Sequence, residues 1–132
     1  MKNQAIFEAA VRLICEVPDA EQTADYTERA PYILASLFSE AAATDAKYRL
    51  SHQSKVAESL PTAYAALDGD FPLSDAFFHP AVYYLASMLV LEENEELSER
   101  LFAKYSDGMA LICAELPATA SPISDRYRLL ST

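Results

Sequence analysis

The strongest hydrophobic pattern in the chain lies between residues 79 and 116. Residues 80–91 are apolar almost without interruption, which predicts a helix buried inside the domain. From residue 97 onward, apolar residues recur every three or four positions, as on one stripe of a helix: Leu97, Leu101, Tyr105, Met109, Ile112 and Leu116. The acidic run at residues 92–96 separates the two segments and should be exposed. We therefore expect an antiparallel helical hairpin with an acidic tip.

Two further helices are predicted before the hairpin. Residues 3–17 carry apolar side chains at helical spacing, and a proline follows them. The next helix should begin near Thr23 to Asp25, because Glu28 lies three residues after Asp25, as in a capping box. Its apolar face extends to Ala41, and Pro31 within it predicts a kink or a restart rather than two separate helices.

The central segment, residues 44–70, fits neither the helical nor the strand period, so we expect irregular structure there, with room for short strands. Prolines and small residues in 117–132 predict an extended or irregular C-terminal tail that still carries apolar side chains for docking. The pattern as a whole predicts an all-α, single-domain helical bundle of about four main helices. We expect residues 1–116 to form the helical domain and residues 117–132 to form a C-terminal tail that is a candidate for docking to a partner.

Composition agrees with one helical domain. A chain of 132 residues suits a single core, and only two glycines favour helices over tightly turned sheets. The net charge of −10 repels phosphate and anionic lipid, so neither sequence-specific nucleic-acid binding nor membrane binding is expected. No apolar run is long enough to cross a bilayer, and the first residues lack the core of a signal peptide. We expect a soluble, cytoplasmic protein.

The sequence shows no motif typical of a catalytic, metal-binding or phosphate-binding site. Cys15 and Cys113 lie on apolar helical patterns and are predicted to be buried free thiols. His52 and His79 lack the spacing of a metal motif, and two glycines cannot build a phosphate-binding loop. The acidic cluster at 92–99 is interpreted as a solvated helix junction rather than a cation site. We expect no catalytic residues, no cofactor and no metal. An enzyme that uses paired carboxylates stays open as a third class of function, although nothing marks a pair as desolvated.

Tyrosine is the enriched polar aromatic residue, with eight copies. Those of the hairpin are predicted to be core residues: Tyr83, Tyr84 and Tyr105. The remaining candidates lie where exposure is expected, and exposed tyrosine is favoured at protein interfaces. Interface and ordinary packing are equally weighted explanations for them: Tyr26, Tyr32, Tyr48 and Tyr127. The candidate interface residues are Tyr26, Tyr32, Ile123, Tyr127, Leu129 and Leu130.

The order of several dispersed features resembles that of one family. They are Tyr26-Thr27-Glu28-Arg29-Ala30-Pro31-Tyr32-Ile33-Leu34, a turn before Phe71-Pro72-Leu73, Tyr83-Tyr84-Leu85-Ala86-Ser87-Met88-Leu89, Lys104-Tyr105 and Ile123-Ser124-Asp125-Arg126-Tyr127. Across residues 23–127 the chain thereby resembles small helical head–tail connector, or adaptor, proteins encoded among the head-morphogenesis genes of tailed bacteriophages and prophages.

The resemblance implies a non-enzymatic, all-α virion assembly protein that forms a ring beneath the portal and extends the DNA channel. Its partners would be the portal or a tail component, and it would form a homo-oligomer on assembly. The C-terminal segment would reach a neighbouring protein, and an acidic channel wall would let DNA slide past. The alternative is a small bacterial protein-interaction or regulatory module that binds its partner through tyrosines.

Overall fold

The described part of the chain contains four α-helices and one short 3₁₀ helix. The computed structural model describes residues 1–15, 20–57 and 59–116. The helices are α1 (Asn3–Ile14), α2 (Ala20–Ser51), η1 (Asp75–Phe77), α3 (Phe78–Val90) and α4 (Glu95–Glu115). In these residues the only strand-like pairing is one antiparallel bridge between Lys2 and Asp70. The predicted all-α, single-domain bundle is therefore confirmed, and the short strands expected in the central segment are not found in its described residues.

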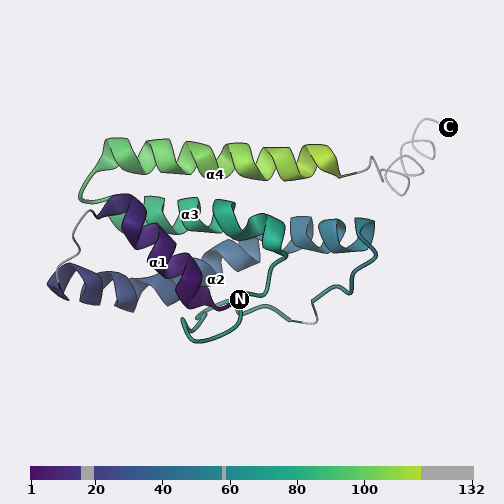
Figure 1. Ribbon diagram of the computed structural model, residues 1–132, viewed down its shortest axis with the longest axis horizontal. Coiled ribbons are helices and arrows are strands. Elements are labelled where there is room, and N and C mark those ends of the chain that lie inside the picture. Colours follow the sequence, from purple (N-terminus) through teal and green to yellow (C-terminus); the bar gives the residue numbers. More distant parts are fainter. Residues whose placement is uncertain (16–19, 58, 117–132) are drawn as a thin grey trace.

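Helix α3 is the centre of the bundle. It lies between α4 and α2, and α1 packs across it (Figure 1). An apolar helix surrounded on several sides can bury nearly its whole circumference. Accordingly nine of its residues are buried: Pro80, Ala81, Val82, Tyr84, Leu85, Ala86, Ser87, Leu89 and Val90.

The predicted hairpin is confirmed in its local details. The side chain of Asn94 caps α4, because its Oδ1 accepts a hydrogen bond from the Leu97 amide at 3.0 Å. The predicted stripe of α4 faces α3 at Leu101, Tyr105 and Ile112, which are all buried. All residues of the acidic tip, 92–96, are exposed.

Helix α2 departs from the prediction at both ends. It begins at Ala20, so Asp25 lies inside the helix and forms an ion pair with Arg29 at 3.2 Å instead of a capping box. It continues through Pro31 as one helix and ends at Ser51, well beyond Ala41. The last turn closes at a left-handed Gln53 (φ 57°), with the Ser54 amide donating to the Arg49 carbonyl at 2.7 Å.

The irregular segment between α2 and η1 is fastened to the N-terminus. The backbone amides of Asn3 and Gln4 donate to the carbonyls of Gly69 and Leu67 at 2.9 and 2.8 Å. These bonds satisfy amides that have no partner within the first turn of α1. The segment also supplies buried apolar side chains to the core: Ala65, Phe71 and Leu73. It is therefore a packed part of the domain.

Other predictions for the termini and thiols are partly wrong. Helix α1 ends at Ile14 rather than residue 17, and residues 16–19 lie outside the described part. Both thiols are free, but Cys15 is only half-buried and Cys113 is exposed. Cys113 follows the buried Ile112, and adjacent residues on a helix face different directions. The prediction of a C-terminal tail concerns residues outside the described part.

No helix among the described residues has both the length and the apolar character needed to span a membrane.

Candidate protein-interaction surface

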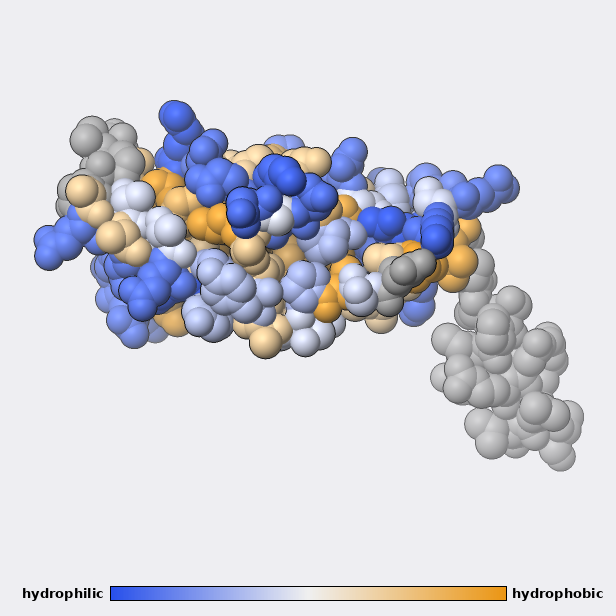
Figure 2. Space-filling view, turned by 90° about the horizontal axis from the view of Figure 1, so that it is seen from below, coloured by the Kyte–Doolittle hydropathy of each residue, from blue (hydrophilic) through white to orange (hydrophobic). Residues whose placement is uncertain are grey.

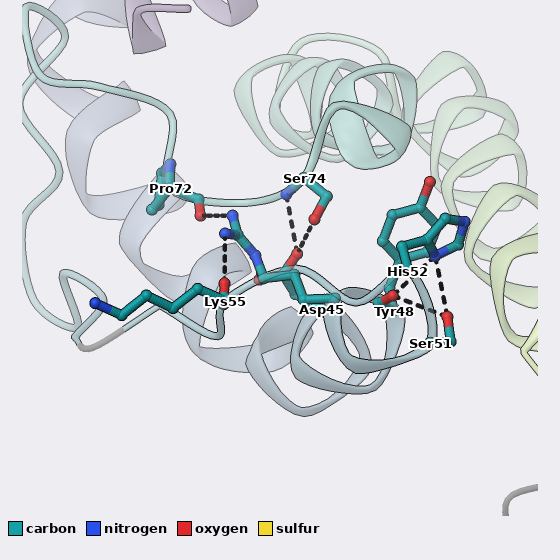
Figure 3. A network of polar contacts seen from close by, with 8 residues as sticks. Asp45, Tyr48, Ser51, His52, Lys55, Pro72 and Ser74 are labelled. Carbon is teal, nitrogen blue, oxygen red and sulfur yellow. Dashed lines mark hydrogen bonds and ion pairs between the residues drawn. The ribbon is translucent and has the colours of Figure 1, made fainter.

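A buried ion pair holds the irregular segment against α2. Asp45 is only 2% exposed, and its carboxylate accepts hydrogen bonds from the Ser74 amide and hydroxyl at 2.9 and 2.8 Å. Arg49, one turn later, donates to Asp45 at 2.9 Å and to the Pro72 carbonyl at 2.8 Å (Figure 3). The guanidinium also donates to the Lys55 carbonyl at 3.2 Å. These contacts fasten both ends of the irregular segment, at Lys55 and at Pro72 and Ser74, to the last turns of α2.

Tyr26 was predicted as an interface residue, and its ring is fully buried instead. Its hydroxyl donates to the Glu93 carboxylate at 2.6 Å, and Gln22 donates to the same carboxylate at 3.2 Å. One residue of the acidic tip thus fastens the hairpin to α2. The prediction of exposure is wrong because a partner 67 residues away allows the polar end of this tyrosine to be buried.

Tyr32 is exposed, as predicted, and the fold brings Tyr64 beside it. Tyr32 lies between the buried Ala30 and Leu34, on the outward side of α2. Its ring meets that of Tyr64 edge to face, with 5.1 Å between the ring centroids. The two side chains are 60% and 54% exposed. We call Tyr32 and Tyr64 the tyrosine pair.

The backbone beneath the tyrosine pair is well anchored. The Ala65 amide donates to the Pro31 carbonyl at 3.0 Å, and the Ala65 side chain is buried. Both residues next to the pair are therefore fixed by a hydrogen bond between α2 and the irregular segment. Figure 2 looks from below, the side on which Figure 1 places α2 and this segment, and hydrophobic residues there form small patches among hydrophilic ones.

The predicted core tyrosines are largely confirmed. Tyr84 and Tyr105 are buried with their ring centroids 5.0 Å apart, whereas Tyr83 is half-buried. The Tyr105 hydroxyl donates to the Glu40 carboxylate at 2.8 Å and so joins α4 to α2. Tyr48, predicted to be exposed, is half-buried, with its ring stacked on His52 at 4.1 Å.

Tyr26 and Tyr105 should lose their phenolic protons only at a higher pH than an ordinary tyrosine. Burial, followed by the adjacent Glu93 carboxylate, raises the pKa of Tyr26, and burial with the adjacent Glu40 carboxylate raises the pKa of Tyr105. Folding thus favours the protonated phenols, and this stabilisation is lost as the pH rises above the unfolded value of about 10. We expect a late phase in the alkaline titration of tyrosinate absorbance, smaller in the Y26F/Y105F double variant. An unchanged late phase in that variant would contradict the assignment.

A second surface feature lies between the end of α3 and the start of α4. It is an open, mainly apolar groove of about 360 Å³ lined by Ser87, Met88, Leu91, Ser98, Glu99, Phe102 and Ala103. Leu91, at the end of α3, is 47% exposed, and Phe102, on α4, is 40% exposed. We call it the α3–α4 groove.

The described residues contain no group of three or more metal-ligating side chains placed to hold an ion. His52 is exposed at the end of α2, where its Nδ1 lies 2.9 Å from the Tyr48 carbonyl and 3.0 Å from the Ser51 hydroxyl (Figure 3). His79 is exposed and lies edge-on to Phe78. His52 thus contacts the last turn of α2, and His79 contacts its neighbour on α3.

Of the six candidate interface residues, the structure describes Tyr26 and Tyr32, and only Tyr32 is exposed. Ile123, Tyr127, Leu129 and Leu130 lie outside the described residues. Sequence reasoning missed Tyr64 and the α3–α4 groove. Tyr64 lies in a segment without a period, so the sequence gives no signal for it. For the groove a signal existed, because Phe102 is a large aromatic residue just off the buried stripe of α4.

Comparisons of this chain with protein families, with curated proteins and with solved structures found no match.

Proposed function

We propose that this protein is a non-enzymatic assembly protein that binds another protein through the tyrosine pair. The supporting observation is that Tyr32 and Tyr64 form a preorganised, exposed aromatic contact, 5.1 Å between centroids, on anchored backbone. Tyrosines bury a large area with little loss of side-chain freedom, and they are enriched among the residues that dominate binding energy. Two of them in contact offer a ready centre for an interface.

The partner that we propose is the portal or a tail component of a tailed bacteriophage or prophage. This part of the proposal comes from the resemblance to head–tail connectors carried by the dispersed tyrosine and apolar positions. In that role the protein forms a homo-oligomer on assembly and extends the DNA channel. The acidic surface suits a channel wall, since it repels the phosphate backbone.

The test is binding to the portal protein encoded in the same genome. We expect the purified protein to co-elute with the portal oligomer in size-exclusion chromatography with light scattering. The Y32A/Y64A double variant should bind at least about tenfold more weakly, since truncating a tyrosine at the centre of an interface costs about 1–2 kcal/mol or more. Leu111→Ala is the matched control, because Leu111 is 67% exposed on α4, away from the tyrosine pair.

Each failure of this test has a distinct meaning. If the native protein does not bind the portal, or if the genome encodes none, the connector function is wrong. If the portal binds the double variant as tightly as the native protein, the interface is wrong. Binding of a non-virion bacterial protein that depends on the tyrosine pair would instead assign the alternative, a small interaction or regulatory module.

A further inference from the structure

The α3–α4 groove exposes large apolar side chains to solvent. Phe102 contacts Tyr105 and Tyr84 at centroid distances of 5.4 and 6.4 Å, yet 40% of it remains exposed. Leu91, across the groove at the end of α3, is 47% exposed. The volume of about 360 Å³ is sufficient for one or two large side chains. The groove therefore fits a short apolar segment.

The acidic residues around the groove indicate which kind of segment would bind there. Residues 78–116 carry seven acidic and only two basic side chains, and Glu99 lines the groove itself. The exposed tip with Glu92, Glu95 and Glu96 adjoins it. Two copies of this face would repel each other, whereas a segment with apolar and basic residues is complementary to it.

The chain itself contains such a segment. Residues 123–130 read Ile-Ser-Asp-Arg-Tyr-Arg-Leu-Leu, with four large apolar side chains, two arginines and one aspartate. Residues 1–116, in contrast, have a large acidic excess. The basic residues Arg126 and Arg128 flank Tyr127, so one short stretch presents both kinds of group that the groove needs.

The chain between Leu116 and residues 123–130 is long enough for these residues to reach the α3–α4 groove. From Leu116 back to Phe102 the distance along α4 is about 21 Å at 1.5 Å per residue. From Leu116 to Tyr127 an extended chain spans up to about 35 Å. A segment tethered within reach has an effective concentration in the millimolar range, which favours it over a free competitor of equal affinity.

We propose that residues 123–130 dock in the α3–α4 groove of their own chain, with Tyr127 and Leu130 against Met88, Leu91 and Phe102, and Arg126 and Arg128 toward the acidic tip. This proposal does not rest on the tyrosine pair, which lies on α2 and the irregular segment.

The experiment uses the methyl groups of the three methionines in the full chain, observed by NMR after selective isotope labelling. Met88 lines the groove, whereas Met1 and Met109 do not, so they are internal references. In the Y127A/L130A variant we expect the Met88 methyl signal to shift and the other two to stay in place. A synthetic peptide of residues 120–132, added to this variant, should return the Met88 signal toward its native position.

A second variant tests the contribution of the two arginines to docking. R126E/R128E should shift the Met88 signal in the same direction as Y127A/L130A, and high salt should reduce docking in the native chain, because screening weakens exposed charge pairs. Thr119→Ala, outside the proposed segment, is the control and should leave all three signals unchanged.

Two results overturn the proposal. If the Met88 signal does not change in either double variant, the segment does not occupy the groove. If tenfold dilution of the native protein moves the Met88 signal to the position seen in Y127A/L130A, the occupant comes from a second copy, and docking within one chain is wrong.

Discussion

Replacing Asp45 by alanine is expected to destabilise the protein by about 3–5 kcal/mol, since breaking a buried pair leaves its partners without compensation. The carboxylate is 2% exposed and accepts from the Ser74 amide, the Ser74 hydroxyl and Arg49. Its loss leaves the half-buried Ser74 amide without a partner and the Arg49 guanidinium, 22% exposed, without its ion pair. A domain of this size has only about 5–15 kcal/mol in total, so the loss is severe.

Urea denaturation followed by circular dichroism measures this effect. Asp45→Asn should cost less than D45A, because the amide oxygen can still accept from Ser74 while the charge is gone. Glu96→Ala is the control, since Glu96 pairs with Arg100 on the surface of α4, where its side chain is 76% exposed. Surface changes of that kind usually stay within about 0.5 kcal/mol. A D45A midpoint equal to that of E96A would show that the irregular segment does not depend on this ion pair.

The parts of the fold that local patterns determine were predictable. The apolar run of α3, the stripe of α4 and the Asn94 cap all follow from residues within a few positions of one another. Each of these elements satisfies its own backbone and buries the face that its sequence marks. The hairpin was therefore predicted almost residue by residue.

The last turns of α2 could not be predicted in this way. The inward position at 45 is occupied by an aspartate, which breaks the apolar stripe, and it is buried because Ser74, 29 residues later, supplies two donors. Hydrophobic periodicity counts such a residue as exposed. The same physical cause explains Tyr26, whose burial depends on Glu93.

Of the tyrosine pair, Tyr32 was predictable from the sequence and Tyr64 was not. Tyr32 follows from its place opposite the buried stripe of α2, which is a local property. Tyr64 has no such pattern, and it reaches Tyr32 only because the irregular segment folds back and the Ala65 amide binds the Pro31 carbonyl. Long-range backbone contacts of this kind leave no periodic trace in the sequence.

Replacing Phe38 by alanine is expected to cost about 3–5 kcal/mol, the usual range for removing a buried phenylalanine. Phe38 is fully buried on α2, and its ring meets that of Phe71 edge to face at a centroid distance of 5.7 Å. The contact joins the longest helix to the irregular segment. Its loss therefore removes packing from both and leaves a cavity beside the core.

A double-mutant cycle distinguishes this contact from general core damage. F38A, F71A and the combined variant are compared by urea denaturation, and we expect a coupling energy of about 0.5–1.5 kcal/mol, as for other aromatic pairs. Phe38→Leu, which keeps most of the volume, should cost less than about 1.5 kcal/mol. Strictly additive effects would mean that the contact between Phe38 and Phe71 adds nothing to stability, and that Phe38 acts only through its contacts with the helices. Coupling in the expected range would show instead that the segment between α2 and η1 is part of one cooperative core.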